Sequence, residues 1–162
     1  MSSDALFGLS ILMSFLAFAI VTKVYIWARL RIMRRTDALI PLVIPHTFRF
    51  VGLSFLIPGV VSPLLSPAFA IPAAYGDLVA AILAGVATLA LAARASWAIP
   101  IVWMFNVWGA VDLLHAFYQG QIGVGIAPGS LGAAFFIPTV VVPPLLIIHG
   151  LIFWLLLRPT DW

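Results

Sequence analysis

Cysteine and glutamate are both absent from this 162-residue sequence, and charged residues make up only 8% of it. Without cysteine the chain can form no disulfide, iron–sulfur cluster or thiol nucleophile. Without glutamate we expect no pair of carboxylates of the kind that glycosidases and aspartic proteases use. A soluble domain is about a quarter charged. The shortage of charge therefore argues against a water-soluble enzyme, a DNA-binding domain and a disordered protein.

Apolar residues take the place of the missing charges. Hydrophobic residues make up 64% of the sequence, and the mean hydropathy is +1.21. A soluble chain of this length could not bury so much apolar surface. We therefore predict a multi-pass membrane protein that is embedded in the lipid bilayer, and the bilayer is thus a predicted partner. The net charge is +3, but the basic residues form no continuous stripe, so we expect no nucleic-acid partner.

Runs of about 20 mostly apolar residues are long enough to cross the hydrocarbon core of a bilayer. Five such runs occur, and they predict an all-α, single-domain bundle of five transmembrane helices. The predicted spans cover approximately residues 5–28, 39–61, 77–93, 97–118 and 133–157.

The segments between these runs alternate in charge. Residues 29–37, residues 94–96 and the segment after Leu157 are basic, whereas residues 62–76 and 119–132 contain no basic residue. Basic loops tend to stay on the cytoplasmic side of a membrane. The pattern therefore predicts an N-outside, C-inside topology with an uncleaved first span. A bacterial inner membrane is the expected location.

Prolines interrupt two of the predicted spans. Each proline lacks a backbone N–H and bends or breaks a helix. We predict broken second and fifth spans, whose freed carbonyls face protein or a wet cavity; ordinary kinks that shape the bundle are the alternative. The prolines concerned are Pro41, Pro45 and Pro58 in the second span, and Pro138, Pro143 and Pro144 in the fifth.

Ionisable side chains inside the predicted spans are the first candidates for a site, because burying them in a membrane is costly. Arg49 lies near the middle of the second span, and His46 precedes it by three residues on nearly the same face. Asp112 and His115 have the same spacing on the fourth span. These four residues form the core of the predicted site.

Further polar and aromatic residues accompany this core. Trp108 lies one turn before Asp112 on the same face of the fourth span. Gln119 lies one turn after His115 on that face. Asn106 points to another side of that helix and needs a partner of its own, such as the carbonyl of a broken helix. His149 lies near the middle of the fifth span. Asp77 is expected at the outer surface, where it complements the N-terminal dipole of the third helix.

We expect Arg49 to pair with Asp112, since the two are the only cation and the only carboxylate expected in the membrane interior. Such a pair would offset much of the cost of desolvating each charge. The pair could simply fix the register of two helices. It could instead form a ligand, proton or anion site with the neighbouring histidines, and charges inside a membrane favour this functional interpretation.

We consider two candidate cofactors, a haem and a quinone. Two facing histidines at equal depth could hold a haem, and aromatic residues such as Trp108 and Tyr118 could wall a flat ligand. The depths of the three histidines are expected to differ, with His46 in the inner half, His149 in the middle and His115 in the outer half. No metal site is expected, because no two histidines share a helix. Aromatic residues at helical spacing more often pack the core.

Two stretches carry a resemblance to known proteins, PHTFRFVGLSFLIPGVV at residues 45–61 and NVWGAVDLLHAFYQG at residues 106–120. They resemble an uncharacterised family of small bacterial polytopic membrane proteins, and this resemblance implies no activity. The length and span count are similar to those of the translocator-protein family of five-helix porphyrin and sterol binders. That family's tryptophan- and proline-rich motifs are absent, so the likeness concerns architecture alone.

Three functions are compatible with these observations. The favoured hypothesis is binding or transport of a small ligand or proton, in a site open to the outer half. In it Arg49 binds an anionic or carbonyl group, Asp112 holds the arginine and His115 titrates. The second is a membrane enzyme or electron carrier that uses quinone or haem. The third is an accessory subunit of a larger membrane complex, and a homo-oligomer also stays open.

Overall fold

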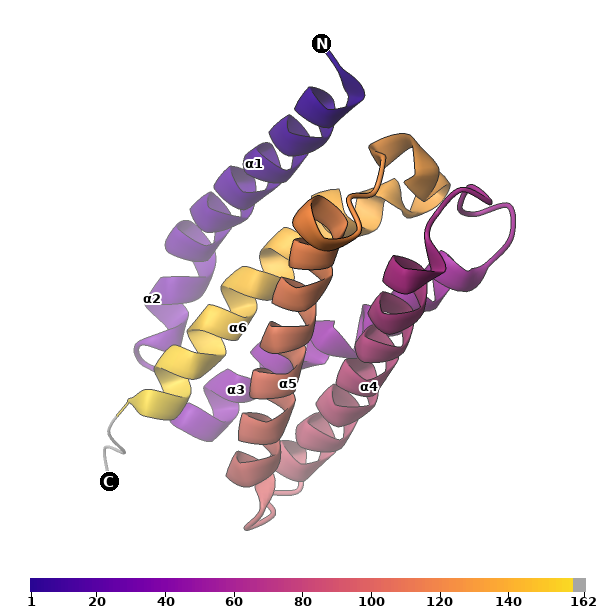
Figure 1. Cartoon of the computed structure of the whole chain (residues 1–162). Helices are drawn as coiled ribbons and strands as arrows, with labels where there is room; N and C mark the ends of the chain where they lie inside the picture. Colours follow the sequence, from indigo (N-terminus) through magenta and orange to yellow (C-terminus); the bar gives the residue numbers. More distant parts are fainter. Residues whose placement is uncertain (159–162) are drawn as a thin grey trace.

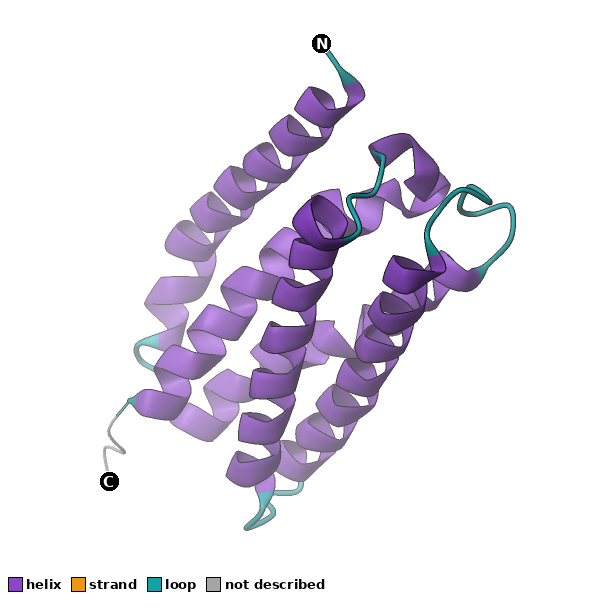
Figure 2. Cartoon of the chain, in the orientation of Figure 1, coloured by secondary structure: helices purple, strands orange, loops and turns teal. Residues whose placement is uncertain are grey.

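The computed structural model describes residues 1–158, and it is helical almost throughout (Figures 1 and 2). Five helical segments are long and apolar enough to cross a membrane: Ser3–Leu30, Arg35–Leu56, Pro67–Ala92, Ala98–Gly123 and Ile137–Leu157. They confirm the prediction of an all-α bundle with five candidate spans.

Four of these five segments contain more than one kind of helix. The first consists of α1 (Ser3–Val21), the π-helix η1 (Thr22–Ile26) and α2 (Trp27–Leu30), and the second of α3 (Arg35–Val43) and the 3₁₀-helix η2 (Ile44–Leu56). The third is α4 (Pro67–Ala92) alone. The fourth consists of α5 (Ala98–Tyr118) and the π-helix η3 (Gln119–Gly123). A 3₁₀-helix, η4 (Pro128–Phe135), leads to the fifth, which comprises the π-helix η5 (Ile137–Val141) and α6 (Val142–Leu157).

The third span differs most from its predicted bounds. It was expected to begin at residue 77, but α4 begins at Pro67. Proline suits the first turn of a helix, because the N–H that it lacks would have no partner there. Asp77 consequently lies inside α4 instead of at its N-terminus.

The two spans with several prolines are both irregular. In the second span, α3 gives way to η2 at Ile44, next to Pro45. In the fifth span, Pro138 lies in η5, and α6 begins just before Pro143 and Pro144. The irregular part of the fifth span is thus confined to its first turns, and the rest is a regular α-helix.

The N-terminus lies at one end of the bundle and the end of α6 at the other (Figure 1). The turns between α2 and α3 and between α4 and α5 share the end where α6 finishes. We call it the basic end, because its segments carry Arg31, Arg94 and Arg158. The Arg35 guanidinium donates to the carbonyl of Leu156 at 2.8 Å and ties two of these segments together.

Two apolar clusters fill the bundle, one toward each end. Along α4, the cluster near the N-terminal end finishes at Ala74, and the cluster near the basic end starts at Ala84. Asp77 falls between the two. The other long helices repeat this order, and the buried polar residues of the interface between the clusters are His46, Arg49, Asp77, Asn106 and His149.

Candidate functional site

The 3₁₀-helix η2 aligns the buried side chains of the second span. A 3₁₀-helix has three residues per turn, so side chains three residues apart stack in line. His46, Arg49, Gly52 and Phe55 have this spacing, and all four are buried. One face of η2 therefore presents a histidine, an arginine and the open space of a glycine to the bundle interior.

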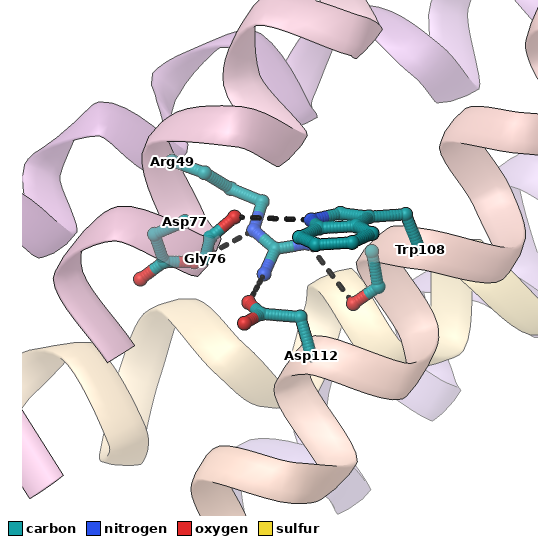
Figure 3. A network of polar contacts seen from close by, with 6 residues as sticks. Arg49, Gly76, Asp77, Trp108 and Asp112 are labelled. Atoms are coloured by element: carbon teal, nitrogen blue, oxygen red, sulfur yellow. Dashed lines mark hydrogen bonds and ion pairs between the residues drawn. The ribbon is translucent and has the colours of Figure 1, made fainter. Parts of the chain in front are cut away.

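Arg49 is only 1% exposed, and it donates hydrogen bonds to two carboxylates and one carbonyl (Figure 3). Its Nε donates to Asp77 Oδ1 at 2.7 Å, and its Nη2 donates to Asp112 Oδ2 at 2.5 Å. Its Nη1 donates to the carbonyl oxygen of Gly109 at 3.0 Å. Residues of η2, α4 and α5 thus meet on one guanidinium, and we call Arg49, Asp77 and Asp112 the arginine cluster.

The arginine cluster contains the expected Arg49–Asp112 pair and one carboxylate that was not expected. Asp77 was assigned to a helix N-terminus at the surface, and this was wrong because α4 begins at Pro67. Asp77 is 7% exposed and shares the arginine. Two carboxylates therefore contact one arginine inside the bundle, contrary to the expectation that Asp112 is the only carboxylate there.

The charges of the arginine cluster do not balance. One guanidinium and two carboxylates sum to one net negative charge when all three are ionised. Within residues 1–158, no group donates a hydrogen bond to Asp77 Oδ2 or Asp112 Oδ1. Each carboxylate therefore keeps an oxygen that can accept a hydrogen bond, a proton or a cation.

Three glycines make room for these side chains, one on each contributing element. A Cβ atom on Gly52 would overlap the carboxylate of Asp77, and one on Gly76 would overlap the carboxylate of Asp112. A Cβ atom on Gly109 would lie 2.8 Å from Nη1 of the arginine. The helices can approach closely around the buried charges only because these positions carry no side chain.

Asn106 and His149 form a second buried polar pair beside the cluster. Nδ2 of Asn106 donates to the backbone carbonyl of His149 at 3.3 Å. The amide oxygen then faces His149 Nδ1 at 2.7 Å, which assigns the ring proton to Nδ1. Asn106 thus has the separate carbonyl partner that was predicted, although the carbonyl belongs to the regular helix α6.

His46 packs directly on His149, with ring centroids 4.2 Å apart. The expectation that these two histidines lie at different depths is therefore wrong. Both nitrogens of His46 and Nε2 of His149 are buried without a hydrogen-bond partner in the described chain. The two rings leave no gap for a porphyrin between them, so the pair does not fit a bis-histidine haem. No group of three or more metal-ligating residues occurs within residues 1–158.

The remaining predicted site residues lie at the border of the cluster or outside it. Trp108 is 46% exposed, and its Nε1 donates to the carbonyl of Gly76 at 3.4 Å (Figure 3). His115 and Gln119 are hydrogen-bonded to each other at 3.3 Å, and Tyr118 is exposed. The structure therefore places Trp108 beside the cluster and leaves the other three at the surface of the fourth span.

A cavity of about 40 Å³ adjoins the arginine cluster on its N-terminal side. Asp77 and Asp112 form part of its wall, and Gln121 adds an amide. A single buried water needs roughly 10–15 Å³, so the cavity has space for only a few waters or a small group. Sequence reasoning proposed Phe117 as a wall residue but missed the rest of the aromatic wall, because a helical pattern cannot locate a space between helices. The phenylalanines of this wall are Phe7, Phe55, Phe69 and Phe117.

A family model described as a domain of unknown function (DUF8737) matches residues 6–157. The chain belongs to this family. Membership of DUF8737 agrees with the resemblance to an uncharacterised family, and the matched residues include the whole arginine cluster and the wall of its cavity. No curated protein and no solved structure matches the chain.

Proposed function

We propose that this DUF8737 protein is a multi-pass membrane protein that binds or transports a small ligand or proton at Asp77 and Asp112. One observation carries the proposal: both carboxylates of a buried, net negative cluster line the same cavity. Charged groups inside a membrane are costly, and they commonly mark ligand or ion pathways.

In this proposal Arg49 holds the carboxylates and does not contact the ligand. Each of its three nitrogens already donates to a protein oxygen, and the side chain is almost fully buried. We therefore replace the hypothesis in which Arg49 binds an anion and His115 titrates. The carboxylate oxygens without a donor are better placed to accept the ligand or the proton.

We further propose that the basic end faces the cytoplasm of a bacterial cell and that the N-terminus lies outside the inner membrane. This orientation follows the preference of basic loops for the cytoplasmic side. The cavity then lies in the outer half of the membrane. The apolar cluster near the basic end separates it from the cytoplasm.

The proposal is tested by thermal unfolding of the purified protein in lipid nanodiscs. The protein is mixed with small cations, small anions or neutral molecules, and is also examined over a series of pH values. We expect a cation or a change of pH to shift the unfolding temperature, because the cluster can accept one positive charge. The double variant Asp77→Asn/Asp112→Asn should lose this response.

Asp37→Asn is the matched control, because Asp37 lies in the first turn of α3 at the basic end. It should respond as the unaltered protein does. The proposal fails if no condition shifts the unfolding temperature, or if the double variant responds like the control. A chromophore in the absorbance spectrum, or an obligate partner that copurifies, would replace it with the electron-carrier or accessory-subunit alternative.

A further inference from the structure

A second space adjoins the cavity of the arginine cluster. This vestibule of about 260 Å³ lies between α1 and the end of α5. Four residues line both spaces and so stand between them: Phe7, Phe117, Gln121 and Ile126. The vestibule alone approaches the roughly 300 Å³ of small-ligand pockets.

Carboxylates are present in both spaces. Asp4 lines the vestibule, and Asp77 and Asp112 line the inner cavity. Within the described chain, no basic residue lines either space. The route from the vestibule to the cluster therefore attracts a cation and repels an anion.

The walls of the route favour an organic cation over a metal ion. Calcium takes six to eight oxygen ligands and magnesium takes six, whereas the inner cavity offers only two carboxylates and the Gln121 amide. Phenylalanines make up much of the remaining wall. An ammonium group can donate to the carboxylates while its apolar substituents pack on these rings, whose faces also attract cations.

The helix that closes the vestibule buries few of its residues in the bundle. Phe7 is the one buried residue of α1, and its ring meets that of Phe135 at 5.6 Å. In the first span as a whole, only 6% of the most apolar window is buried (Figure 1 shows α1 at the edge of the bundle). Moving Phe7 aside would join the vestibule to the inner cavity.

The geometry points to an amphiphilic ammonium ion as the ligand, entering between α1 and α5 past Phe7 and binding with its nitrogen at Asp77 and Asp112. This inference rests on the proposed function and specifies its ligand. The apolar part of the ion lies among the phenylalanines and extends into the vestibule.

The first test uses the full chain in nanodiscs with three probes: phenethylammonium, its uncharged analogue 2-phenylethanol, and sodium. Isothermal titration calorimetry measures the binding. We expect phenethylammonium to bind at least about tenfold more tightly than the alcohol, because only the ammonium makes charge-assisted hydrogen bonds to the carboxylates. Asp112→Asn should weaken its binding by about tenfold, and Asp37→Asn should leave it unchanged.

The outcomes separate this inference from the proposed function. Equal binding of the two phenyl probes overturns the inference, and this comparison needs no variant to fold. If phenethylammonium does not bind, but sodium binds or the protein responds to pH, the inference is overturned and the proposed function stands. If no probe binds and pH has no effect, both fall.

A second test addresses the route. Phe7→Ala removes the buried anchor of α1, and Leu12→Ala removes a side chain that is 55% exposed on the same helix. We expect Phe7→Ala to raise the association rate of phenethylammonium several-fold in stopped-flow measurements, and Leu12→Ala to leave it unchanged. The same rate in both variants would rule out entry past Phe7.

Discussion

The half of the bundle near the basic end and the half near the N-terminal end are both built of helices but differ in what lies between these helices. Near the basic end, Leu39, Val102 and Leu155 belong to the apolar core and have no exposed surface themselves. Near the N-terminal end, the apolar cluster encloses a cavity with two carboxylates in its wall. We call the packed half near the basic end the seal, and the half that encloses the cavity the chamber.

Buried alanines line α4 in both halves, and a glycine and an aspartate interrupt them between the two clusters. On α4, the buried residues near the basic end are mostly alanines such as Ala84 and Ala87, which allow close packing. Near the middle of the same helix, Gly76 and Asp77 replace them, and the glycine leaves space for a carboxylate.

The largest expected effect on stability comes from removing Arg49, the cation that pairs with the two carboxylates of the chamber. Arg49→Gln leaves two buried carboxylates without a partner and should lower the free energy of unfolding by about 3–5 kcal/mol. Unfolding of the purified protein in a denaturing detergent measures this loss. Adding Asp112→Asn alone should restore only part of it, because Asp77 stays unpaired.

The triple variant Arg49→Gln/Asp77→Asn/Asp112→Asn removes all three charges and should be more stable than Arg49→Gln. Simple additivity of the three stability changes would show that the residues do not interact, and it would contradict the arginine cluster.

The next effect sharpens the distinction between seal and chamber. Leu155→Ala opens a void in the core near the basic end and should cost about 2–5 kcal/mol of unfolding free energy. Leu157→Ala, on the same helix but 71% exposed, is the control and should cost much less. Ligand binding at the cluster should survive in both variants. Loss of binding in Leu155→Ala alone would mean that the two halves are not independent.

A smaller effect is expected from filling the space beside a carboxylate. Gly76→Ala places a methyl group against the Asp112 side chain and should cost about 1–3 kcal/mol, as overpacking does in cores. Gly85→Ala lies on the same helix, where a Cβ meets nothing within 4 Å. It should be neutral or slightly stabilising, because alanine favours helix over glycine. Equal unfolding free energies for the two variants would contradict the close packing around the cluster.

The smallest effect on stability comes from substitutions that report which end faces which side of the membrane. The chain has no cysteine, so single cysteines can be placed freely. Leu64→Cys lies at an 88% exposed position near the N-terminal end, and Ser96→Cys lies at an exposed position in the turn before α5. In intact cells a membrane-impermeant thiol reagent should label only Leu64→Cys. Labelling of Ser96→Cys alone would reverse the proposed orientation.

The number of spans and one ion pair could be predicted from the sequence for simple physical reasons. Apolar runs of membrane-spanning length are unambiguous in a chain with so few charges. Arg49 and Asp112 were expected to pair because a lone buried charge is too costly. The burial of Asp77 could not be predicted in the same way. Pro67 and Pro72 resemble loop residues, and only the structure shows that α4 starts at one and continues through the other.

The contact between His46 and His149 shows a second limit. Depth along a span is estimated from its first residue and from the rise of an α-helix. Here the second span starts at Arg35, and His46 lies in a 3₁₀-helix, where each residue advances about 2.0 Å instead of 1.5 Å. The apolar run from which the span was predicted shows neither its starting point nor its type of helix.

The position of the arginine cluster between the two apolar clusters has an electrical consequence. In the proposed orientation, a cation that reaches Asp77 from outside has crossed part of the voltage across the membrane. One elementary charge that crosses the whole membrane gains about 2.3 kcal/mol per 100 mV. Occupancy of the site should therefore rise as the cytoplasm becomes more negative, so that an energised cell would load the site more fully than a depolarised one.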